Sequence, residues 1–156
     1  MTNFHISPSG EVADALRAGR PVVALESTIV SHGLPRPHNL QVARQIEQAV
    51  RDAGAVPATI GMVGGRLVVG LDDAELTRLA TVDGVAKLSV RDLALAAATG
   101  ADGATTVAAT SAVAAAAGIG VFATGGLGVM RWHPGLDEAT LPERVVDAAL
   151  AGLRPR

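Results

Sequence analysis

The 156-residue chain has no cysteine and no tyrosine, and it has only one tryptophan and two phenylalanines. Without cysteine it forms no disulfide, carries no thiolate nucleophile and builds no Cys-ligated zinc site. The few aromatic side chains leave little for base stacking, and a net charge of -2 supplies no basic stripe for a phosphate backbone. We therefore expect no nucleic-acid partner.

Long apolar runs are also absent. No run of about 18 or more consecutive residues is apolar, and Met1–His5 lacks a basic segment followed by an apolar one. We expect neither export nor a membrane partner, and the lack of cysteine fits a cytoplasmic location. The content of 49% hydrophobic residues is sufficient for one globular core.

Lysine is nearly absent as well, because 12 of the 13 basic residues are arginine. The single lysine, Lys87, carries a compact charge that can be deprotonated, which guanidinium cannot do. Lys87 is therefore a candidate functional residue. It is an equally good interpretation that Lys87 is a surface residue without a role.

One stretch places several reactive groups after an apolar segment. Val22–Leu25 is a short apolar run that leads into the carboxylate of Glu26, and it is bounded by Pro21 and, further on, by Gly33. This pattern predicts a strand covered on both faces, and ligands of open α/β sheets bind beyond the carboxyl ends of such strands. Glu26 is a candidate general acid, unless an arginine or helix N–H groups neutralise it.

The same stretch contains Ser27, Ser31 and His32, which could suggest a serine hydrolase. Residues in one bend need not converge, however, and the chain has no Gly-x-Ser-x-Gly turn. The histidines lack any recognised ligand spacing, so the sequence predicts no histidine metal site.

Strands and helices alternate along the rest of the chain. We predict a helix at 39–52 that Asn39 caps and that buries Val42, Ile46, Ala49, Val50 and Ala53. Further helices are predicted at 11–17, 72–80 and 91–100, and an alanine-rich helix that follows Gly103–Thr110 is predicted to end at Ala117. Further strands are predicted at 55–63, 85–90 and 118–124, and Gly64 and Gly65 with residues 66–70 predict a hairpin. The alternation indicates a mixed, mostly parallel sheet with helices on both faces.

The segment Gly103–Thr110 combines glycine and threonine just before an alanine-rich helix. A helix N-terminus with free N–H groups suits a phosphate. Taken alone, the segment fits a tightly packed internal helix better than a phosphate site.

Five blocks in the same order resemble the pseudouridine-5'-phosphate glycosidases, also called the indigoidine synthase A-like family. The blocks are Ala24–Pro35, Gly54–Ile60, Lys87–Leu93, Gly103–Thr110 and Val121–Gly128.

The resemblance implies a three-layer α/β/α fold in a manganese-dependent homotrimer. It also implies reversible cleavage of the C–C glycosidic bond of pseudouridine 5'-phosphate to uracil and ribose 5-phosphate. In the family the glutamate of the first block is the proton donor, which falls on Glu26. The lysine of the third block and the valine of the fourth contact substrate, which falls on Lys87 and Val107.

The chain departs from the family after residue 128. Val129–Gly135 does not match the family's next segment, and no lysine follows Lys87 to serve as the Schiff-base nucleophile. Asp137 and Glu138 lie near the expected metal aspartate, but the motif around them is missing, so we assign no metal ligand.

We therefore expect residues 1–128 to be the N-terminal half of a family domain, truncated relative to the family and inactive alone. Residues 129–156 are predicted to be a divergent tail with a terminal helix. The alternative is a non-catalytic half-domain that binds a sugar phosphate or is completed by a partner.

Overall fold

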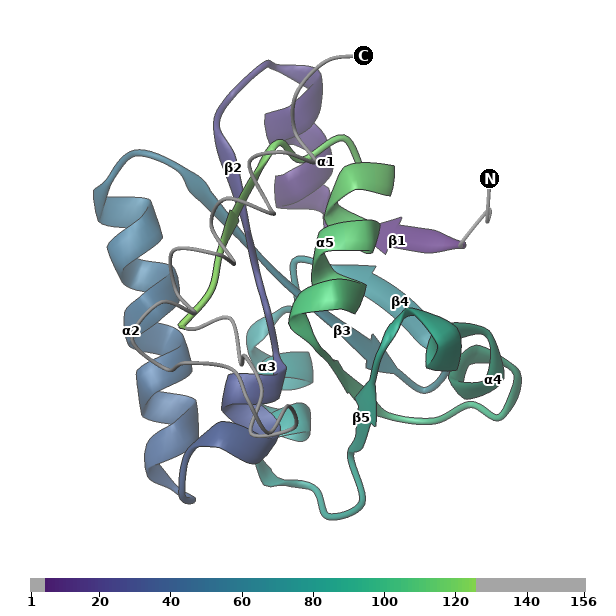
Figure 1. Cartoon of the computed structure of the whole chain (residues 1–156). Coiled ribbons are helices and arrows are strands. Elements are labelled where there is room, and N and C mark those ends of the chain that lie inside the picture. Colours follow the sequence, from purple (N-terminus) through teal and green to yellow (C-terminus); the bar gives the residue numbers. More distant parts are fainter. Residues whose placement is uncertain (1–4, 126–156) are drawn as a thin grey trace, which may run out of the picture. The chain divides into compact units, whose positions relative to one another are not determined.

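The computed structural model describes residues 5–125, which lie in one unit (Figure 1). The predicted terminal helix, Asp137 and Glu138 lie outside the described residues. In chain order the elements are β1 (Ile6–Pro8), α1 (Gly10–Arg17), β2 (Val22–Leu25), the π-helix η1 (Ile29–Gly33), α2 (His38–Asp52), β3 (Val56–Val63), β4 (Arg66–Val69), α3 (Asp73–Thr81), β5 (Ala86–Leu88), the 3-10 helix η2 (Val90–Asp92), α4 (Leu93–Ala98), β6 (Gly103–Thr105), α5 (Val107–Ala116) and β7 (Val121–Ala123).

Side-chain caps explain where three of the helices begin. Ser9 accepts a bond from the backbone of Val12 at the start of α1, and Thr106 caps α5 in the same way. At α3, Asp72 and Glu75 bond each other's backbone N–H groups, which confirms the predicted capping box. These caps satisfy N–H groups that have no partner inside the helix.

The sheet branches at its long central strand. Its main path is β1-β4-β3-β2-β7, and β6 also pairs with β3 and carries β5 beside it. Four of the six pairings are parallel, and the two that β3 makes with β4 and β6 are antiparallel. The predicted mixed, mostly parallel sheet is therefore confirmed.

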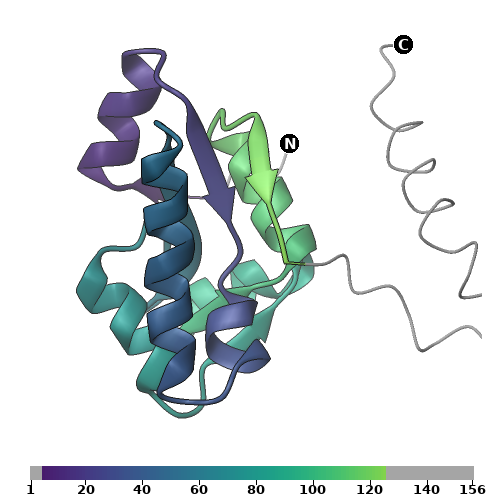
Figure 2. The same ribbon diagram turned by 90° about the vertical axis from the view of Figure 1, so that its left-hand side faces the viewer.

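Two hydrophobic clusters cover alternate side chains of the strands. One joins α1, α4 and α5 to the β3 residues Val56, Ala58, Ile60 and Met62, and the other joins α2 and α3 to Val68 of β4. Because successive strand residues point to opposite faces, the clusters lie on the two sides of the sheet. Figures 1 and 2 show α2 on one side of β2 and α5 on the other. The three-layer α/β/α arrangement follows.

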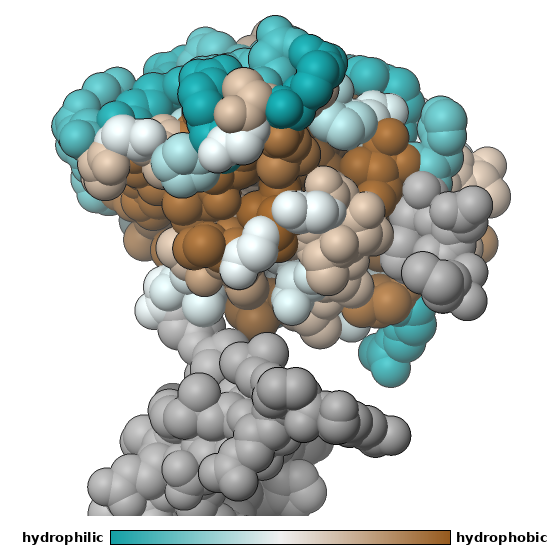
Figure 3. Space-filling view, turned by 90° about the horizontal axis from the view of Figure 1, so that it is seen from above, coloured by the Kyte–Doolittle hydropathy of each residue, from teal (hydrophilic) through white to brown (hydrophobic). Residues whose placement is uncertain are grey.

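The α4, α5 and β7 part of the unit carries little charge. Asp102 is the only charged residue between Leu93 and Gly125, and α5 is apolar around most of its circumference. Val121 of β7 is 57% exposed. Seen from above, hydrophobic residues fill the middle of the face and hydrophilic ones gather on one side (Figure 3). No helix among the described residues has the length and apolar character needed to cross a membrane.

The prediction for α2 is partly wrong. The helix begins one residue earlier, after Pro37, and the side chain of Asn39 does not cap it. Ala49 and Ala53 are exposed, whereas the fully buried residues of the helix are Asn39 and Ala43. The physical reason is that the amide of Asn39 bonds to other segments, which turns its side of the helix toward the protein interior.

Three other local features differ from what the sequence predicts. The sequence did not predict the π-helix at Ile29–Gly33. The strand predicted at 85–90 ends at Leu88, because Ser89 and Asp92 form a reciprocal capping box that starts η2. The last predicted strand is shorter than expected and covers only Val121–Ala123.

Candidate active site where strands β2 and β6 meet

The carboxyl ends of β2 and β6 point toward each other along one edge of β3. Strand β2 runs parallel to β3 and pairs with Val56–Thr59, whereas β6 runs antiparallel and pairs with Gly61 and Met62. Strand β5 runs parallel to β6, so its carboxyl end reaches the same region. Three strand ends that carry predicted site segments therefore converge, as expected for a ligand site in an α/β sheet.

Buried hydroxyl groups join the two opposed strand ends. Ser27 Oγ donates to the carbonyl of Ile60 at 2.6 Å and accepts from the backbone N–H of Thr105 at 2.8 Å. Thr105 Oγ1 donates to the same Ile60 carbonyl at 2.7 Å, and Thr110 Oγ1 lies 2.9 Å from Thr105 Oγ1. Ser27, Thr105 and Thr110 are fully buried. The segment with Glu26 is thus tied to the segment that starts α5.

The carboxyl group of Glu26 is half-buried and held by two hydroxyls. Thr28 Oγ1 lies 2.8 Å from Oε2, and Thr124 Oγ1, just after β7, lies 2.5 Å from Oε1. No arginine pairs with Glu26 among residues 5–125, so the predicted alternative of arginine neutralisation is not supported there.

Glu26 lies at the wall of a cavity of about 240 Å³. The other lining residues are mostly apolar, and they come from β2, η1, α2 and the end of β7: Leu25, Ile29, Ile46, Ala123, Thr124 and Gly125. A carboxyl group beside a small apolar cavity can transfer a proton to a ligand that displaces water from it.

Lys87 lies at the middle of β5, opposite Ala104 of β6. Its side chain is exposed, and it makes no hydrogen bond or ion pair with any residue from 5 to 125. The neighbouring Leu88 is buried, and its carbonyl accepts from the N–H of Thr106 at 2.9 Å. The strand with Lys87 is therefore bonded to the residue that caps α5.

Val107 is the first residue of α5 and is half-buried. The cap residue Thr106 accepts a bond from Ala109 N, which satisfies one of the first N–H groups of the helix. The N–H groups of Val107 and Ala108 have no acceptor within the helix and lie at the positive end of its dipole. The structure thus brings the Glu26, Lys87 and Val107 segments together, although Glu26 and Lys87 share no direct bond.

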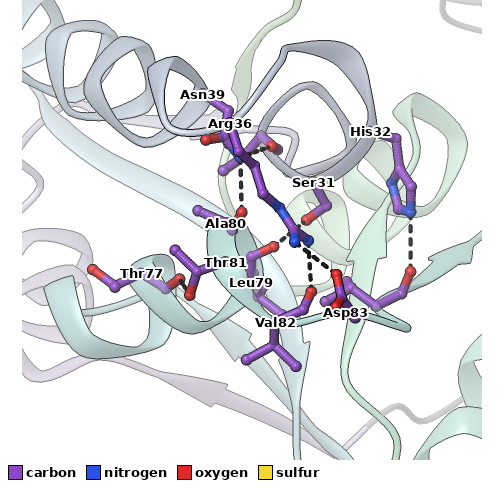
Figure 4. A network of polar contacts seen from close by, with 12 residues as sticks. Ser31, His32, Arg36, Asn39, Thr77, Leu79, Ala80, Thr81, Val82 and Asp83 are labelled. Atoms are coloured by element: carbon purple, nitrogen blue, oxygen red, sulfur yellow. Dashed lines mark hydrogen bonds and ion pairs between the residues drawn. The ribbon is translucent and has the colours of Figure 1, made fainter.

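A second polar network fixes the segment after Glu26 against the end of α3 (Figure 4). Ser31 Oγ donates to the carbonyl of Leu79 at 2.8 Å, and His32 Nε2 lies 3.0 Å from the carbonyl oxygen of Val85. Ser31 and His32 therefore bond separate backbone carbonyls and form no nucleophile–base pair. The serine hydrolase alternative has no support in this geometry.

Asn39 is the central residue of that network. Its Nδ2 atom donates to the carbonyl of Val30 in η1 and to the carbonyl of Ala80 in α3, each at 2.8 Å. Arg36 donates to the carbonyl of Val82 at 2.8 Å and to the carboxylate of Asp83 at 2.7 Å. The network therefore bonds the segment between β2 and α2 to the end of α3 and to the segment that leads to β5.

A further carboxyl group lies in a separate cavity of about 300 Å³, which is lined by residues of α1, α2, β3 and the start of α3. Burial raises the pKa of Glu47 above its usual value, although a bond from Thr59 Oγ1 and the charge of Arg51 oppose this shift. Glu11, in the same cavity, has a lowered pKa because Arg51 donates to it. Neither carboxyl group belongs to the Glu26 cavity.

The described residues do not fit the manganese site that the resemblance implies. No group of three or more histidine, aspartate or glutamate side chains between residues 5 and 125 could hold a metal ion.

The sequence did not indicate Thr124, Thr105 or Ile46 as site residues. Thr124 could have been found, because it is the last residue of a predicted strand, where side chains reach the ligand edge of the sheet. Ile46 was predicted only as a core residue of its helix. The pairing of Ser27 with Thr105 spans 78 positions and leaves no local signal.

The chain is similar to known proteins in sequence. The family described as "Indigoidine synthase A like protein" matches residues 11–139. A pseudouridine-5'-phosphate glycosidase of Salinispora tropica is 72% identical over 99% of this chain and 49% of its own length. A glycosidase of the same name from Streptomyces griseus is 60% identical over 84% of this chain and 41% of its own. The chain spans about half the length of these curated relatives.

Two solved structures are also similar. One is the prealnumycin C-glycosynthase AlnA in complex with ribulose 5-phosphate, with a TM-score of 0.71 and 49% sequence identity. The match covers 80% of this chain and 40% of the AlnA chain. The other is an indigoidine synthase A-like protein of Thermotoga maritima, with a TM-score of 0.72 and 34% sequence identity. The match covers 85% of this chain and 42% of the Thermotoga chain. From the family match and these relatives, the chain belongs to the indigoidine synthase A-like protein family.

Proposed function

We propose that this chain supplies the proton donor and part of the phosphate pocket of a pseudouridine-5'-phosphate glycosidase. Such an enzyme cleaves the C–C bond between uracil and ribose 5-phosphate and can form it in reverse. Relatives that are 60–72% identical carry this name, which supports the proposal. The observation that carries it is the carboxyl group of Glu26, held by two hydroxyls at the wall of an apolar cavity.

Glu26 has the role of the general acid. When the C–C bond breaks, its electron pair stays with C5 of uracil, and that carbon must then receive a proton. The reaction takes up one water molecule overall, whose oxygen ends on C1' of ribose 5-phosphate. A carboxyl group whose two oxygens accept from Thr28 and Thr124 has few orientations, which keeps it in place at the wall of the cavity. In the reverse direction the same carboxylate accepts the proton from C5.

Lys87 and the N-terminus of α5 are proposed to bind the phosphate. Lys87 has an exposed ammonium group without a partner among the described residues, and its strand is bonded to the cap of α5. The first N–H groups of α5, at Val107 and Ala108, add the positive end of a helix dipole. A charge and a helix end together suit the phosphate of a sugar phosphate.

Turnover is proposed to need a second lysine that forms a Schiff base with the opened ribose, and this chain has none after Lys87. Manganese, a homotrimer and a cytoplasmic location remain expectations from the family resemblance. The second candidate function is a half-domain that binds a sugar phosphate without catalysis. Phosphate binding by Lys87 and the N-terminus of α5 would not require the Schiff-base lysine.

Calorimetry with ribose 5-phosphate and an assay for uracil release from pseudouridine 5'-phosphate, with manganese added, test the proposal together. We expect binding of ribose 5-phosphate without uracil release. Uracil release that Glu26→Gln abolishes would show that the second lysine is dispensable. Absence of ribose 5-phosphate binding would contradict the proposal and its alternative.

A further inference from the structure

We infer that Ser27 and Thr105 are positioning residues, whose buried hydroxyls fix the spacing between Glu26 and the N-terminus of α5. This inference rests on the proposed function for the role of the two ends that are joined. Neither hydroxyl lines the Glu26 cavity, so both would act through their neighbours in the chain.

The hydroxyls occupy a break in the pairing of the sheet. On this edge of β3, pairing with β2 stops at Thr59 and pairing with β6 resumes at Gly61, so Ile60 belongs to neither pairing. Its carbonyl instead accepts from Ser27 Oγ at 2.6 Å and from Thr105 Oγ1 at 2.7 Å. Two side chains thus complete the sheet where two strand ends meet.

The bonds leave these hydroxyls one consistent arrangement. Ser27 uses its proton on Ile60 and a lone pair on the N–H of Thr105, and Thr105 uses its proton on the same carbonyl. Thr110 Oγ1, 2.9 Å away, can then donate to Thr105 Oγ1. Because Ser27, Thr105 and Thr110 are fully buried, water cannot replace any of these bonds.

Both buried hydroxyls lie close in the sequence to the residues that they would position. Ser27 directly follows the proposed proton donor, and Thr105 lies two positions before Val107. Backbone pairing with β3 holds each strand up to Ile60, and the side-chain bonds of Ser27 and Thr105 bridge the gap between the acid and the phosphate-binding helix end. Removal of either hydroxyl should change that separation while most of the sheet persists.

Three variants and a matched control test this inference. Ser27→Ala and Thr105→Val each remove one hydroxyl, and Thr105→Ser keeps the hydroxyl while it loses the methyl group. Ser31→Ala is the control, because it also removes a serine hydroxyl that donates to a backbone carbonyl, but at Leu79. All proteins are compared at a temperature at which circular dichroism shows them folded.

The first readout needs no ligand. In amide NMR spectra, Ser27→Ala and Thr105→Val are expected to shift the Val107 and Ala108 resonances, whereas Thr105→Ser and Ser31→Ala leave them close to wild type. If Ser27→Ala does not fold, the comparison of Thr105→Val with Thr105→Ser decides. Unchanged Val107 and Ala108 resonances in the folded hydroxyl-deletion variants would overturn the inference.

The second readout is the affinity for ribose 5-phosphate, measured by calorimetry. We expect a loss of about tenfold in Ser27→Ala and Thr105→Val, and changes within about twofold in Thr105→Ser and Ser31→Ala. Wild-type affinity in both deletion variants would overturn the positioning role. If the wild-type chain itself does not bind, the proposed function fails, and the ligand-free spectra still decide whether the hydroxyls set the position of the helix end.

Discussion

Thr124 donates its hydroxyl to Glu26 Oε1 at 2.5 Å, although 98 positions separate the two residues. The bond connects the end of β7 to the end of β2, which are neighbouring parallel strands. The site around Glu26 is thus assembled from both ends of the described chain. The orientation of the proposed acid therefore depends on a residue that directly follows β7.

Replacement of Thr124 by valine should destabilise the protein. The substitution keeps the shape of the side chain but removes a donor to a half-buried carboxyl group, and a typical intramolecular hydrogen bond contributes about 0.5–1.5 kcal/mol. Urea unfolding measures the loss. Thr124→Ser, which keeps the hydroxyl, should recover most of it, and an equal loss in both variants would show that the bond to Glu26 is not the cause.

Replacement of Asn39 by leucine should be more costly than any other amide substitution on α2. Two backbone carbonyls, of Val30 and Ala80, would lose their donor in a buried place, at about 1–3 kcal/mol for each unsatisfied group. Gln41→Leu on the same helix removes an exposed amide and should change the free energy of unfolding by less than about 0.5 kcal/mol. Similar effects of the two variants in urea unfolding would contradict the role of Asn39.

Glu47 should make the protein less stable as the pH rises. Burial raises the pKa of Glu47 in the folded protein, so the folded state binds the proton more tightly than the unfolded chain does. Its contribution to stability is fully present below the ordinary pKa of 4.5 and is lost as the pH rises through the higher folded pKa. Glu47→Gln should therefore gain stability over wild type at about pH 7 and not at about pH 4.

Glu11 provides the opposite control. The bond from Arg51 lowers the pKa of Glu11, so its contribution is present above the ordinary pKa and lost as the pH falls through the folded one. Glu11→Gln should therefore lose stability mainly at about pH 7. Urea unfolding at both pH values measures the differences, and the same sign for the two variants would refute the assignment.

Local chemistry explains what could be predicted from the sequence. Val22–Leu25 was recognised as a buried strand from its apolar run, and the capping box of Asp72 and Glu75 from its spacing. The hairpin at Gly64 and Gly65 was also predictable, because both residues take a positive φ that favours glycine. Features of this kind depend on a few adjacent residues.

The features that were missed depend on contacts between distant residues. Asn39 looked like a helix cap, since asparagine is common there, but two tertiary bonds engage its amide. Nothing in the order of the residues indicated that β2 and β6 would meet end to end at Ile60. Glu26 was a candidate because it follows an apolar strand, and Lys87 because it is the only lysine, whereas Val107 came from the family resemblance alone. The bonds that join their segments became visible only in the structure.

The central claim is that Lys87 and the N-terminus of α5 bind the phosphate group near Glu26. The most direct measurement is an NMR titration of the chain with ribose 5-phosphate, in wild type, in Lys87→Met and in Arg17→Met, which removes an exposed cation on α1. We predict that the amide resonances of Val107 and Ala108 shift in wild type and Arg17→Met, and that Lys87→Met weakens binding about tenfold without loss of stability. Absence of shifts at Val107 and Ala108, or equal affinity in Lys87→Met and wild type, would contradict the account.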